Sequence, residues 1–333
     1  MPVIYVKEQG SIIKKVNERI VIEKNKCVLA DIPVHMITDL SVIGNVQIST
    51  QAIHLLMEEG VDISFFNYSG KYLGQAAAES SKNIFLRFEQ FERYQDIDKR
   101  LDMARAIVFN KVNNQIMVIK NFRWEGIEYD YNSCIKEMLD ILATLPGKST
   151  SNEIMGVEGR CSAVYFKCFG QMFRGDIKFE KRTRRPPKDP VNVILSLAYT
   201  LLTKEVASSL ESESFELYLG FLHGIRYGRK SLALDIVEEF RQPVVDRLVV
   251  RLFNLRIMNT LDFETREDEI ILTEEGFQKF CKQYEKWMNK PIDINEKRSF
   301  REVIHDQVGK LKRAIREREE YRPYQWREEN VCD

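Results

Sequence analysis

The amino-acid sequence predicts an α+β fold of two domains, a small N-terminal β-sandwich-like domain and a larger all-α C-terminal domain. Short β-branched or aromatic runs, bounded by glycine, dominate the chain before residue 78. Small residues over 74–82 then mark a change of character, and the chain beyond them has helical periodicity with mixed charge. The length of 333 residues suits about two domains of roughly 150 residues each.

In chain order, the β-domain is expected over residues 1–78. Its strands are predicted at residues 3–6, 20–22, 46–48 and 61–66, with a short helix over 51–59 and a hairpin turn over 68–72. Residues 79–90 are expected to form a linker that runs into the first helix.

The larger domain is expected over residues 91–320 and, as the site of any chemistry, is the expected catalytic domain. Helices are predicted over 83–100, 101–121, 134–145, 153–169, 191–208, 214–221, 231–242, 243–257, 274–287 and 296–320, with a small hairpin over 264–273. Ser231 is interpreted as a helix N-cap, and Pro243 as a restart of the chain, because proline tolerates a first helical turn but not an interior position. The tail over 321–333 is expected to be loosely ordered.

Composition excludes several classes of protein. The 50 basic and 50 acidic residues cancel, so any nucleic-acid binding must come from local basic patches. No run of eighteen apolar residues exists and no signal-peptide pattern begins the chain, so we expect no membrane span. The six cysteines include no C-x-x-C pair, which favours a reducing cytoplasm over a zinc or disulfide framework. Motifs for phosphate loops, dinucleotide binding and nucleophile elbows are absent.

The most informative stretch is residues 220–241. It carries His223, a loop rich in glycine and basic residues, and a helix on which Asp235 lies three residues before Glu238 and four before Glu239. Like charges at these spacings cost a helix roughly 0.2–0.5 kcal/mol per pair. A solvated acidic face and a hydrogen-bonded core histidine are the ordinary interpretation. A bound cation is the functional alternative.

A third acid, Glu158, lies between Gly156 and Gly159 at the predicted start of an apolar helix. It is either a solvent-facing acid favoured by the helix dipole or a carboxylate that the two glycines leave open to a ligand. Glu158, His223 and Glu238, with Asp235 beside them, offer hard oxygen ligands and one imidazole. That set suits Mg²⁺ or Mn²⁺ better than Zn²⁺.

A basic, proline-containing loop follows at residues 181–190, where five of the eight residues 181–188 are Lys or Arg. A solvated charge run is the commoner explanation of such a cluster, and a phosphate-binding loop is the alternative. The candidate phosphate contacts, which would be DNA-binding residues if the ligand is a nucleic acid, are Arg182, Arg184, Arg185, Lys188, Arg229 and Arg241.

Four segments in a fixed order resemble one known family. They are the sequence Gly156-Val-Glu158-Gly159 with Tyr165-Phe166, the segment from Arg185 to Ser196, Gly220-Phe-Leu-His223, and the segment from Ser231 to Arg241. Together they resemble the CRISPR-associated integrase, the adaptation protein that inserts new spacers. The resemblance extends to the N-terminal β-run and covers nearly the whole chain.

The resemblance implies one divalent metal, Mg²⁺ or Mn²⁺, per subunit, held by Glu158, His223 and Glu238 with Asp235 adjacent. Glu239, beside Glu238, stays open as a further candidate. It also implies a homodimer, a small ferredoxin-like CRISPR partner, and double-stranded DNA as substrate, both as spacer precursor and as repeat array. The expected activity is metal-dependent integration by attack of a DNA 3′-hydroxyl on a phosphodiester, with endonuclease activity. The alternatives are a structure-selective metal-dependent nuclease and a non-catalytic DNA-binding scaffold.

Overall fold

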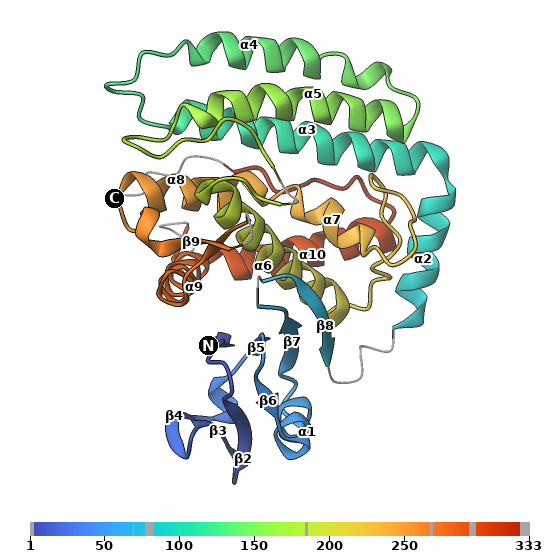
Figure 1. Cartoon of the computed structure of the whole chain (residues 1–333). Helices are drawn as coiled ribbons and strands as arrows, with labels where there is room; N and C mark the ends of the chain where they lie inside the picture. The colour runs from blue at the N-terminus through green and yellow to red at the C-terminus, as the bar shows by residue number, and fades with distance from the viewer. Residues whose placement is uncertain are drawn as a thin grey trace. The chain divides into compact units, whose positions relative to one another are not determined.

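The computed structural model describes residues 3–68, 70–76, 83–183, 186–266, 269–292 and 298–326 (Figure 1). The chain forms two compact units, each described here by itself. Unit 1 comprises Met1–Ser80 and Ile271–Glu285, and unit 2 comprises Ser81–Ile270 and Lys286–Asp333. Unit 1 therefore includes a segment that was not part of the predicted first domain, because residues 271–285 group with the N-terminal strands.

Unit 1 contains two four-stranded sheets. One has the order β1-β5-β7-β8, with β1, β5 and β7 parallel and β8 antiparallel to β7. The other has the order β4-β3-β2-β6, in which β6 runs parallel to β2. The strands are β1 (Val3–Val6), β2 (Ile12–Val16), β3 (Arg19–Lys24), β4 (Cys27–Pro33), β5 (Asp39–Ile43), β6 (Gln47–Ile48), β7 (Asp62–Phe66) and β8 (Tyr72–Ala76).

One apolar core joins the sheets of unit 1. Ile13 and Ile20 of the second sheet pack in the same buried cluster as Leu40 and Ile63 of the first. The helix α1 (Thr50–Glu58) adds Leu55 to this cluster, and a 3₁₀ turn, η1 (Val34–Met36), follows β4. The expected sandwich-like β-domain is thus confirmed.

The returning segment supplies partners to the first strand within unit 1. It begins at the end of β10 (Glu269–Leu272) and includes most of α9 (Glu274–Met288). The Tyr5 hydroxyl donates to Glu285 Oε1 at 2.8 Å, and the buried Lys7 ammonium lies 4.3 Å from the Phe277 ring centre.

Unit 2 is predominantly helical. Within it α3, α4 and α5 lie side by side (Figure 1). Its helices are α2 (Ile84–Gln95), α3 (Ile97–Asn121), α4 (Tyr131–Leu142), α5 (Ser151–Gly170), α6 (Pro190–Ser212), α7 (Ser231–Val237), α8 (Arg247–Asn254) and α10 (Phe300–Arg316). Shorter elements are the 3₁₀ turns η2 (Leu145–Gly147) and η4 (Thr260–Asp262), the π-helix η3 (Arg241–Asp246), and β9 (Phe263–Arg266), which pairs with β10.

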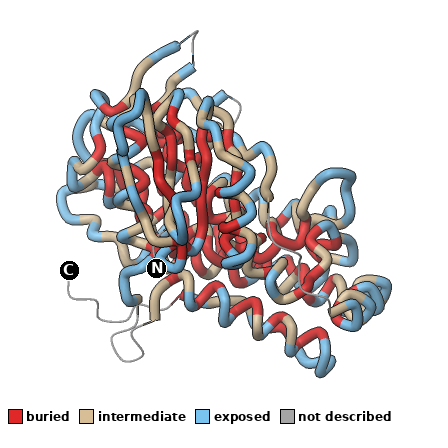
Figure 2. Tube along the Cα trace, turned by 90° about the horizontal axis from the view of Figure 1, so that it is seen from below, coloured by how far each residue is buried: buried red, intermediate tan, exposed pale blue. Residues whose placement is uncertain are grey.

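The helix α6 forms much of the core of unit 2. Asp189 caps it by accepting from Asn192 N at 2.8 Å, and Pro190 occupies its first turn. Among the described helices, α6 is long and apolar enough to span a membrane by length and composition. Of its apolar window, 61% is buried within the structure, as in a core helix. The buried segments appear red in Figure 2.

Several predicted elements differ from the structure. The helix expected over 214–221 is absent. Ser214 has a φ of 73°, and the side-chain amide of Gln90 forms hydrogen bonds with the backbone of this segment. Gln90 Nε2 donates to Glu216 O and Leu219 O at 3.0 and 3.1 Å, and Glu216 N donates to Gln90 Oε1. These bonds replace the helical ones.

The region after His223 also corrects two predictions. Lys230, not Ser231, is the N-cap of α7, and no side chain caps this helix. α7 ends at Val237, and Pro243 lies inside the π-helix η3 rather than at the start of a new α-helix.

The tail expected over 321–333 is held more firmly than predicted as far as residue 326. Tyr321 and Trp326 are buried, and Trp326 N donates to Asn114 Oδ1 at 2.9 Å. Residues 327–333 lie outside the described chain, as do residues 79–82 of the expected linker. The rest of that linker belongs to α2 from Ile84 onward.

Candidate active site

Two of the three predicted metal ligands, Glu158 and Glu238, contact the same lysine ammonium. Glu158 lies in the interior of α5, and Glu238 directly follows α7. Between them lies Lys111 of α3, whose Nζ contacts Glu158 Oε1 and lies 2.5 Å from Glu238 Oε2. The Lys111 side chain is only 6% exposed, so its charge is directed inward. The fold thus brings the two carboxylates together around a positive charge.

Glu238 is the more deeply buried of the two acids. Burial opposes its ionisation, but Arg241 and Lys111 outweigh burial and hold its pKa at about 2. Arg241 Nε lies 3.2 Å from Glu238 Oε1. Glu238 is therefore ionised at neutral pH inside the protein.

Glu158 is the more accessible acid, with 24% of its side chain exposed. Ser162, one turn further along α5, donates its hydroxyl to Glu158 Oε1 at 2.8 Å, and Gln115 Nε2 donates to Ser162 Oγ at 3.2 Å. Gly156 and Gly159 flank it with no atom near the place where a Cβ would lie. Because residues one or two positions apart on a helix do not face each other, these glycines do not border the carboxylate, and its own exposure is what leaves it accessible.

Asp235 holds His223 from α7. The aspartate is fully buried and accepts from the backbone N–H groups of Leu222 and His223 at 2.9 and 3.0 Å. Its Oδ1 lies 2.7 Å from His223 Nδ1. Because Asp235 acts as the acceptor here, Nδ1 carries the proton and Nε2 is the ring nitrogen left for a ligand.

A close backbone approach makes this arrangement possible. A Cβ on Gly220 would lie 2.7 Å from the carbonyl carbon of Ser231, at the start of α7. Glycine therefore lets the segment before His223 pack directly against the helix that carries Asp235. Arg229 donates to His223 O and closes the loop between them.

The donor chemistry fits a divalent cation, although the full set of three ligands does not converge. Within the described ranges, no group of three His, Cys, Asp or Glu side chains is arranged to hold a metal ion. Two neighbouring carboxylates supply the oxygen ligands that such an ion prefers, and an imidazole fixed by a carboxylate is typical of a metal-binding histidine. The three-ligand set of Glu158, His223 and Glu238 stays a prediction.

Glu239 faces a different part of unit 2 from Glu238. It accepts from the Tyr321 hydroxyl and from Tyr324 N, both at 2.6 Å. Burial raises the pKa of Glu239 to about 7. Its carboxylate thus fastens the C-terminal segment.

The predicted DNA contacts have different environments. Arg184 and Arg185 lie outside the described residues. Lys188 is exposed, whereas the Arg182 guanidinium donates to Asn192 Oδ1 and Ser196 Oγ at 2.8 and 2.9 Å. The guanidinium groups of Arg182 and Arg241 lie 5.5 and 4.7 Å from the ring centre of Tyr199.

Sequence reasoning missed Lys111 and the groups around Asp246. Asp246 accepts from the hydroxyls of Tyr165, at 2.8 Å, and Tyr199. Burial raises its pKa to about 6. The signal for Lys111 was weak, because it is one of several charged residues on a long helix. Only its apolar neighbours at positions 107, 108 and 112 hint that it faces inward.

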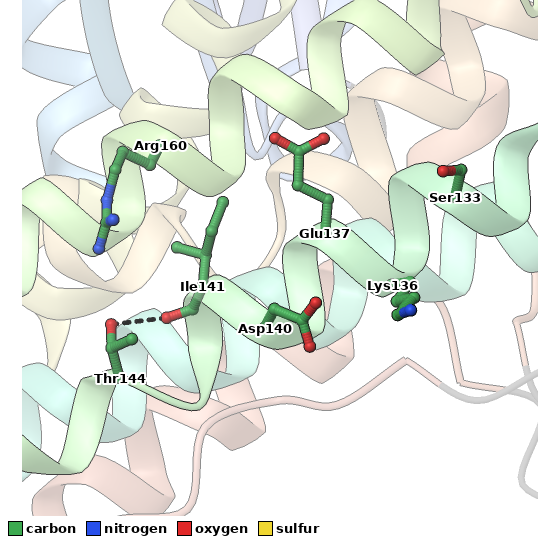
Figure 3. A pocket seen from close by; sticks show the side chains of 7 residues that line it. All are labelled: Ser133, Lys136, Glu137, Asp140, Ile141, Thr144 and Arg160. Carbon is green, nitrogen blue, oxygen red and sulfur yellow. Dashed lines mark hydrogen bonds between the residues drawn. The ribbon is translucent and has the colours of Figure 1, made fainter.

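A shallow cavity of about 430 Å³ on the surface of α4 and α5 has a different character (Figure 3). Its lining mixes two basic and two acidic residues, and Thr144 Oγ1 donates to Ile141 O at 2.7 Å. It contains neither Glu158 nor any other residue of the candidate site.

Known proteins resemble this chain over most of its length. A family model described as CRISPR associated protein Cas1 matches residues 4–286. The chain is 32% identical over 330 residues to the CRISPR-associated endonuclease Cas1 3 of Thermus thermophilus, covering 97% of this chain and 96% of that protein. It is 31% identical to Cas1 1 of Chlorobaculum tepidum, with 97% and 98% covered.

Solved structures agree with these sequence relatives. A Cas1 protein from Thermotoga maritima is 27% identical and superposes with a TM-score of 0.82, covering 99% of this chain and 100% of that one. A casposase bound to an integration product shares the fold at 22% identity, with a TM-score of 0.88 over 100% of this chain and 96% of that one. The α+β architecture and the resemblance seen in the sequence are confirmed, and the chain belongs to the Cas1 family of CRISPR-associated endonucleases.

Proposed function

We propose that this protein is a metal-dependent DNA integrase and endonuclease of CRISPR adaptation, acting in the cytoplasm. The reaction is the attack of a DNA 3′-hydroxyl on a phosphodiester of the repeat array. The observation that carries the proposal is the pairing of Glu158 and Glu238 around one buried cation, in the same unit as a histidine fixed by Asp235.

Glu158, Glu238 and His223 Nε2 are the proposed ligands of one Mg²⁺ or Mn²⁺ per subunit. When bound, the ion supplies stabilisation of the charge that develops on the phosphoryl oxygens. Asp235 is a positioning residue, because it orients the imidazole through Nδ1. Arg241 keeps Glu238 ionised and so available as a ligand.

Lys111 has a distinct part in this proposal. Two carboxylates in one buried place repel each other, and the ammonium offsets that repulsion while no metal is bound. Glu158 and Glu238 would both bind a divalent ion only if the Lys111 ammonium moved from between them. Lys111 thus prepares the pair for a cation and also competes with that cation.

The family and its relatives support the proposed substrate and partners. The casposase with the same fold was captured with an integration product, and a Cas6-RT-Cas1–Cas2 complex contains a chain of this fold. We propose double-stranded DNA as substrate, both spacer precursor and repeat array, together with a homodimer and a small ferredoxin-like partner. Phosphate contacts are proposed for Arg182, Arg184, Arg185, Lys188, Arg229 and Arg241.

The test compares three variants, Glu158→Ala, His223→Ala and Glu238→Ala, on a supercoiled plasmid that carries a repeat. All three should lose strand transfer and cleavage by more than about a hundredfold, because each removes a metal ligand. DNA affinity measured in chelator should be retained, since phosphate contacts elsewhere hold the substrate. Glu137→Ala, an exposed acid on α4, is the matched control and should behave as the parent protein.

Three outcomes would change the assignment. Cleavage of branched DNA without strand joining would favour a structure-selective nuclease. The other alternative is a non-catalytic DNA-binding scaffold. In such a protein the acids would form ion pairs, as Glu158 and Glu238 do with Lys111. Substantial metal-dependent activity in folded Glu158→Ala would refute the mechanism. DNA binding without any metal-dependent chemistry in the parent protein would favour the scaffold.

A further inference from the structure

Unit 2 contains a second cavity, here called the distal cavity, with a volume of about 720 Å³. It lies where α3, α8 and α9 end and where α10 begins, and Trp326 of the C-terminal segment completes its wall. Its volume falls in the range of roughly 300–1,000 Å³ that is usual for small-molecule sites. It shares no lining residue with the group around Lys111.

The lining of the distal cavity is strongly basic. No Asp or Glu side chain lines it, although the whole chain carries equal numbers of acids and bases. Its five cationic residues are Arg123, Arg174, Arg247, Arg251 and Lys290. This local excess of positive charge is the electrostatic pattern of a site for an anion.

Helix dipoles account for only a small part of this excess. Three helix C-termini meet at the cavity, each worth roughly −0.5 of an elementary charge, and one N-terminus contributes roughly +0.5. Their sum offsets about one of the five positive charges. The positive charge of the lining therefore exceeds what the helix dipoles offset.

The cations divide into structural and accessible ones. The Arg247 guanidinium lies 4.1 Å from the ring centre of Trp326 and 5.4 Å from that of Trp287. Arg174 donates to Arg123 O and Glu125 O at 2.8 and 3.2 Å. Arg251 and Lys290, in contrast, are exposed side chains at the rim.

The wall of the cavity is largely aromatic. Trp287 is fixed by donation from Nε1 to Val244 O at 2.9 Å, and its ring centre lies 6.0 Å from that of Phe300. Phe122 and Trp326 also line the cavity. These rings offer flat apolar surface beside the cationic side chains.

We propose that the distal cavity binds a nucleotide. Its phosphate would contact Arg251 and Lys290 at the rim, and its base would lie against the aromatic wall. The same chemistry is offered by a free nucleotide and by an unpaired nucleotide of a DNA strand. Flat aromatic rings beside guanidinium groups suit a nucleobase and phosphate better than an acidic peptide.

The cavity is connected to the candidate active site through a short series of contacts. Trp326 N donates to Asn114 Oδ1, and Asn114 Nδ2 donates to the carbonyl of Glu239, next to Glu238. On the other wall, Trp287 bonds to Val244 of the π-helix that begins with Arg241. A nucleotide held here would therefore be linked to the candidate active site through these contacts without touching its side chains.

The test measures binding of 2-aminopurine 2′-deoxyriboside 5′-monophosphate to the full chain by fluorescence quenching. The double variant Arg251→Ala/Lys290→Ala should bind it at least about tenfold more weakly, because two charge-assisted contacts are lost. The control is Lys120→Ala/Lys286→Ala, which removes two exposed charges from α3 and α9 without touching the lining. It should bind as the parent protein does.

Competitors then define the ligand. The nucleoside without phosphate and inorganic phosphate alone should each compete at least about tenfold less well than the nucleotide. Quenching of free nucleotide identifies a small-molecule site. Quenching confined to 2-aminopurine at an unpaired end of an oligonucleotide identifies a DNA strand as the source. Either result supports the proposal, and Glu158→Ala should retain the quenching whether or not it loses strand transfer.

Three results would overturn it. Equal binding by the rim variant and its control would show that the rim charges do not contact the ligand. Equal competition by inorganic phosphate would show that the aromatic wall does not contribute to binding. Binding that appears only after removal of residues 327–333, which include Glu328, Glu329 and Asp333, would identify the acidic end of the chain as the occupant.

Discussion

One ammonium group sets the charge balance of the candidate active site. Lys111 contacts Glu158 and Glu238, and the side chains of Lys111 and Glu238 are almost fully buried. Removing one member of a buried ionic group leaves the others uncompensated, which typically costs about 3–5 kcal/mol.

Replacing Lys111 by methionine should therefore have opposite effects on the metal-free and metal-bound protein. In chelator, the free energy of unfolding should fall by about 3 kcal/mol, because Glu158 then loses the ammonium that it contacts and Glu238 depends on Arg241 for compensation. Mn²⁺ should raise the melting temperature more in Lys111→Met than in the parent, since no ammonium competes for the carboxylates. Thermal melts with and without Mn²⁺ measure both effects.

Lys120→Met, an exposed change on the same helix, is the control for helix propensity and charge. An equal gain in melting temperature from Mn²⁺ in Lys111→Met and in the parent would contradict the idea that Lys111 competes with the metal.

At the scale of single residues, the sequence identified the two acids but not the lysine that neutralises them. Glu158 and Glu238 were singled out because acids beside glycine or beside another acid on a helix are conspicuous. Lys111 was missed, since its role depends on a contact with residues 47 and 127 positions further along the chain. The different environments of Glu238 and Glu239 were equally invisible, because only the folded C-terminal segment brings Tyr321 to Glu239.

Among the elements, the π-helix η3 has the largest effect on the candidate site. Its first residue, Arg241, contacts Glu238, and its last, Asp246, is buried between Tyr165 and Tyr199. The sequence placed a boundary at Pro243. A π-helix has wider backbone hydrogen bonding, so it keeps the proline inside one continuous segment.

Asp246 should give this element a measurable pH dependence. Burial raises its pKa from 3.8 to about 6, so between these values the native protein holds a proton that the unfolded chain has lost. The free energy of unfolding therefore falls as pH rises through this window, and the loss is complete above about pH 6. From pH 4 to pH 7, the contribution of Asp246 should decrease by about 2 kcal/mol.

Urea unfolding of the parent and of Asp246→Asn at several pH values isolates this contribution, because the amide does not titrate. The difference in unfolding free energy between the two proteins should shrink by that amount as pH rises. A difference independent of pH would mean that Asp246 is ionised throughout.

Gly220 makes a second prediction at the scale of elements. Alanine there would place a Cβ 2.7 Å from the backbone of Ser231, so the segment before His223 must move away from α7. Gly220→Ala should lower the free energy of unfolding by about 1–3 kcal/mol and weaken Mn²⁺ binding about tenfold or more, because His223 loses its position on Asp235. Calorimetric titration with Mn²⁺ and urea unfolding provide the two measurements.

Gly156→Ala on α5 is the matched control. No atom lies within 4 Å of its added Cβ, and alanine is favoured over glycine in a helix by up to about 1 kcal/mol. This variant should be as stable as the parent or slightly more so. Equal effects of the two substitutions would remove the special role of Gly220.

Across the whole molecule, the order of elements was largely predictable and the grouping of segments was not. Short β-branched runs gave β1, β3, β6 and β7 but missed the other four described strands of unit 1, and apolar periodicity gave α3, α5 and α6 to within a few residues. The assignment of residues 271–285 to unit 1 had no local signal, because it depends on pairs such as Tyr5 with Glu285 and Lys7 with Phe277.

A fragment of residues 1–80 should accordingly be less stable than the same fragment joined by a flexible linker to residues 271–285. The shorter fragment lacks the ring that covers the buried ammonium of Lys7 and the acceptor of the Tyr5 hydroxyl. Circular dichroism melts of the two fragments measure the difference. Equal melting temperatures would show that the first 80 residues fold without the returning segment.

This discontinuity has a consequence for how the protein is made. At roughly 5–20 residues per second, a ribosome needs about 10–40 s to synthesise residues 81–270, which separate the two parts of unit 1. Throughout that interval the N-terminal strands exist without their last helix, while the chain that will become unit 2 is still emerging. The first unit to begin folding therefore cannot finish early, because its completion waits for a segment translated after most of its neighbour.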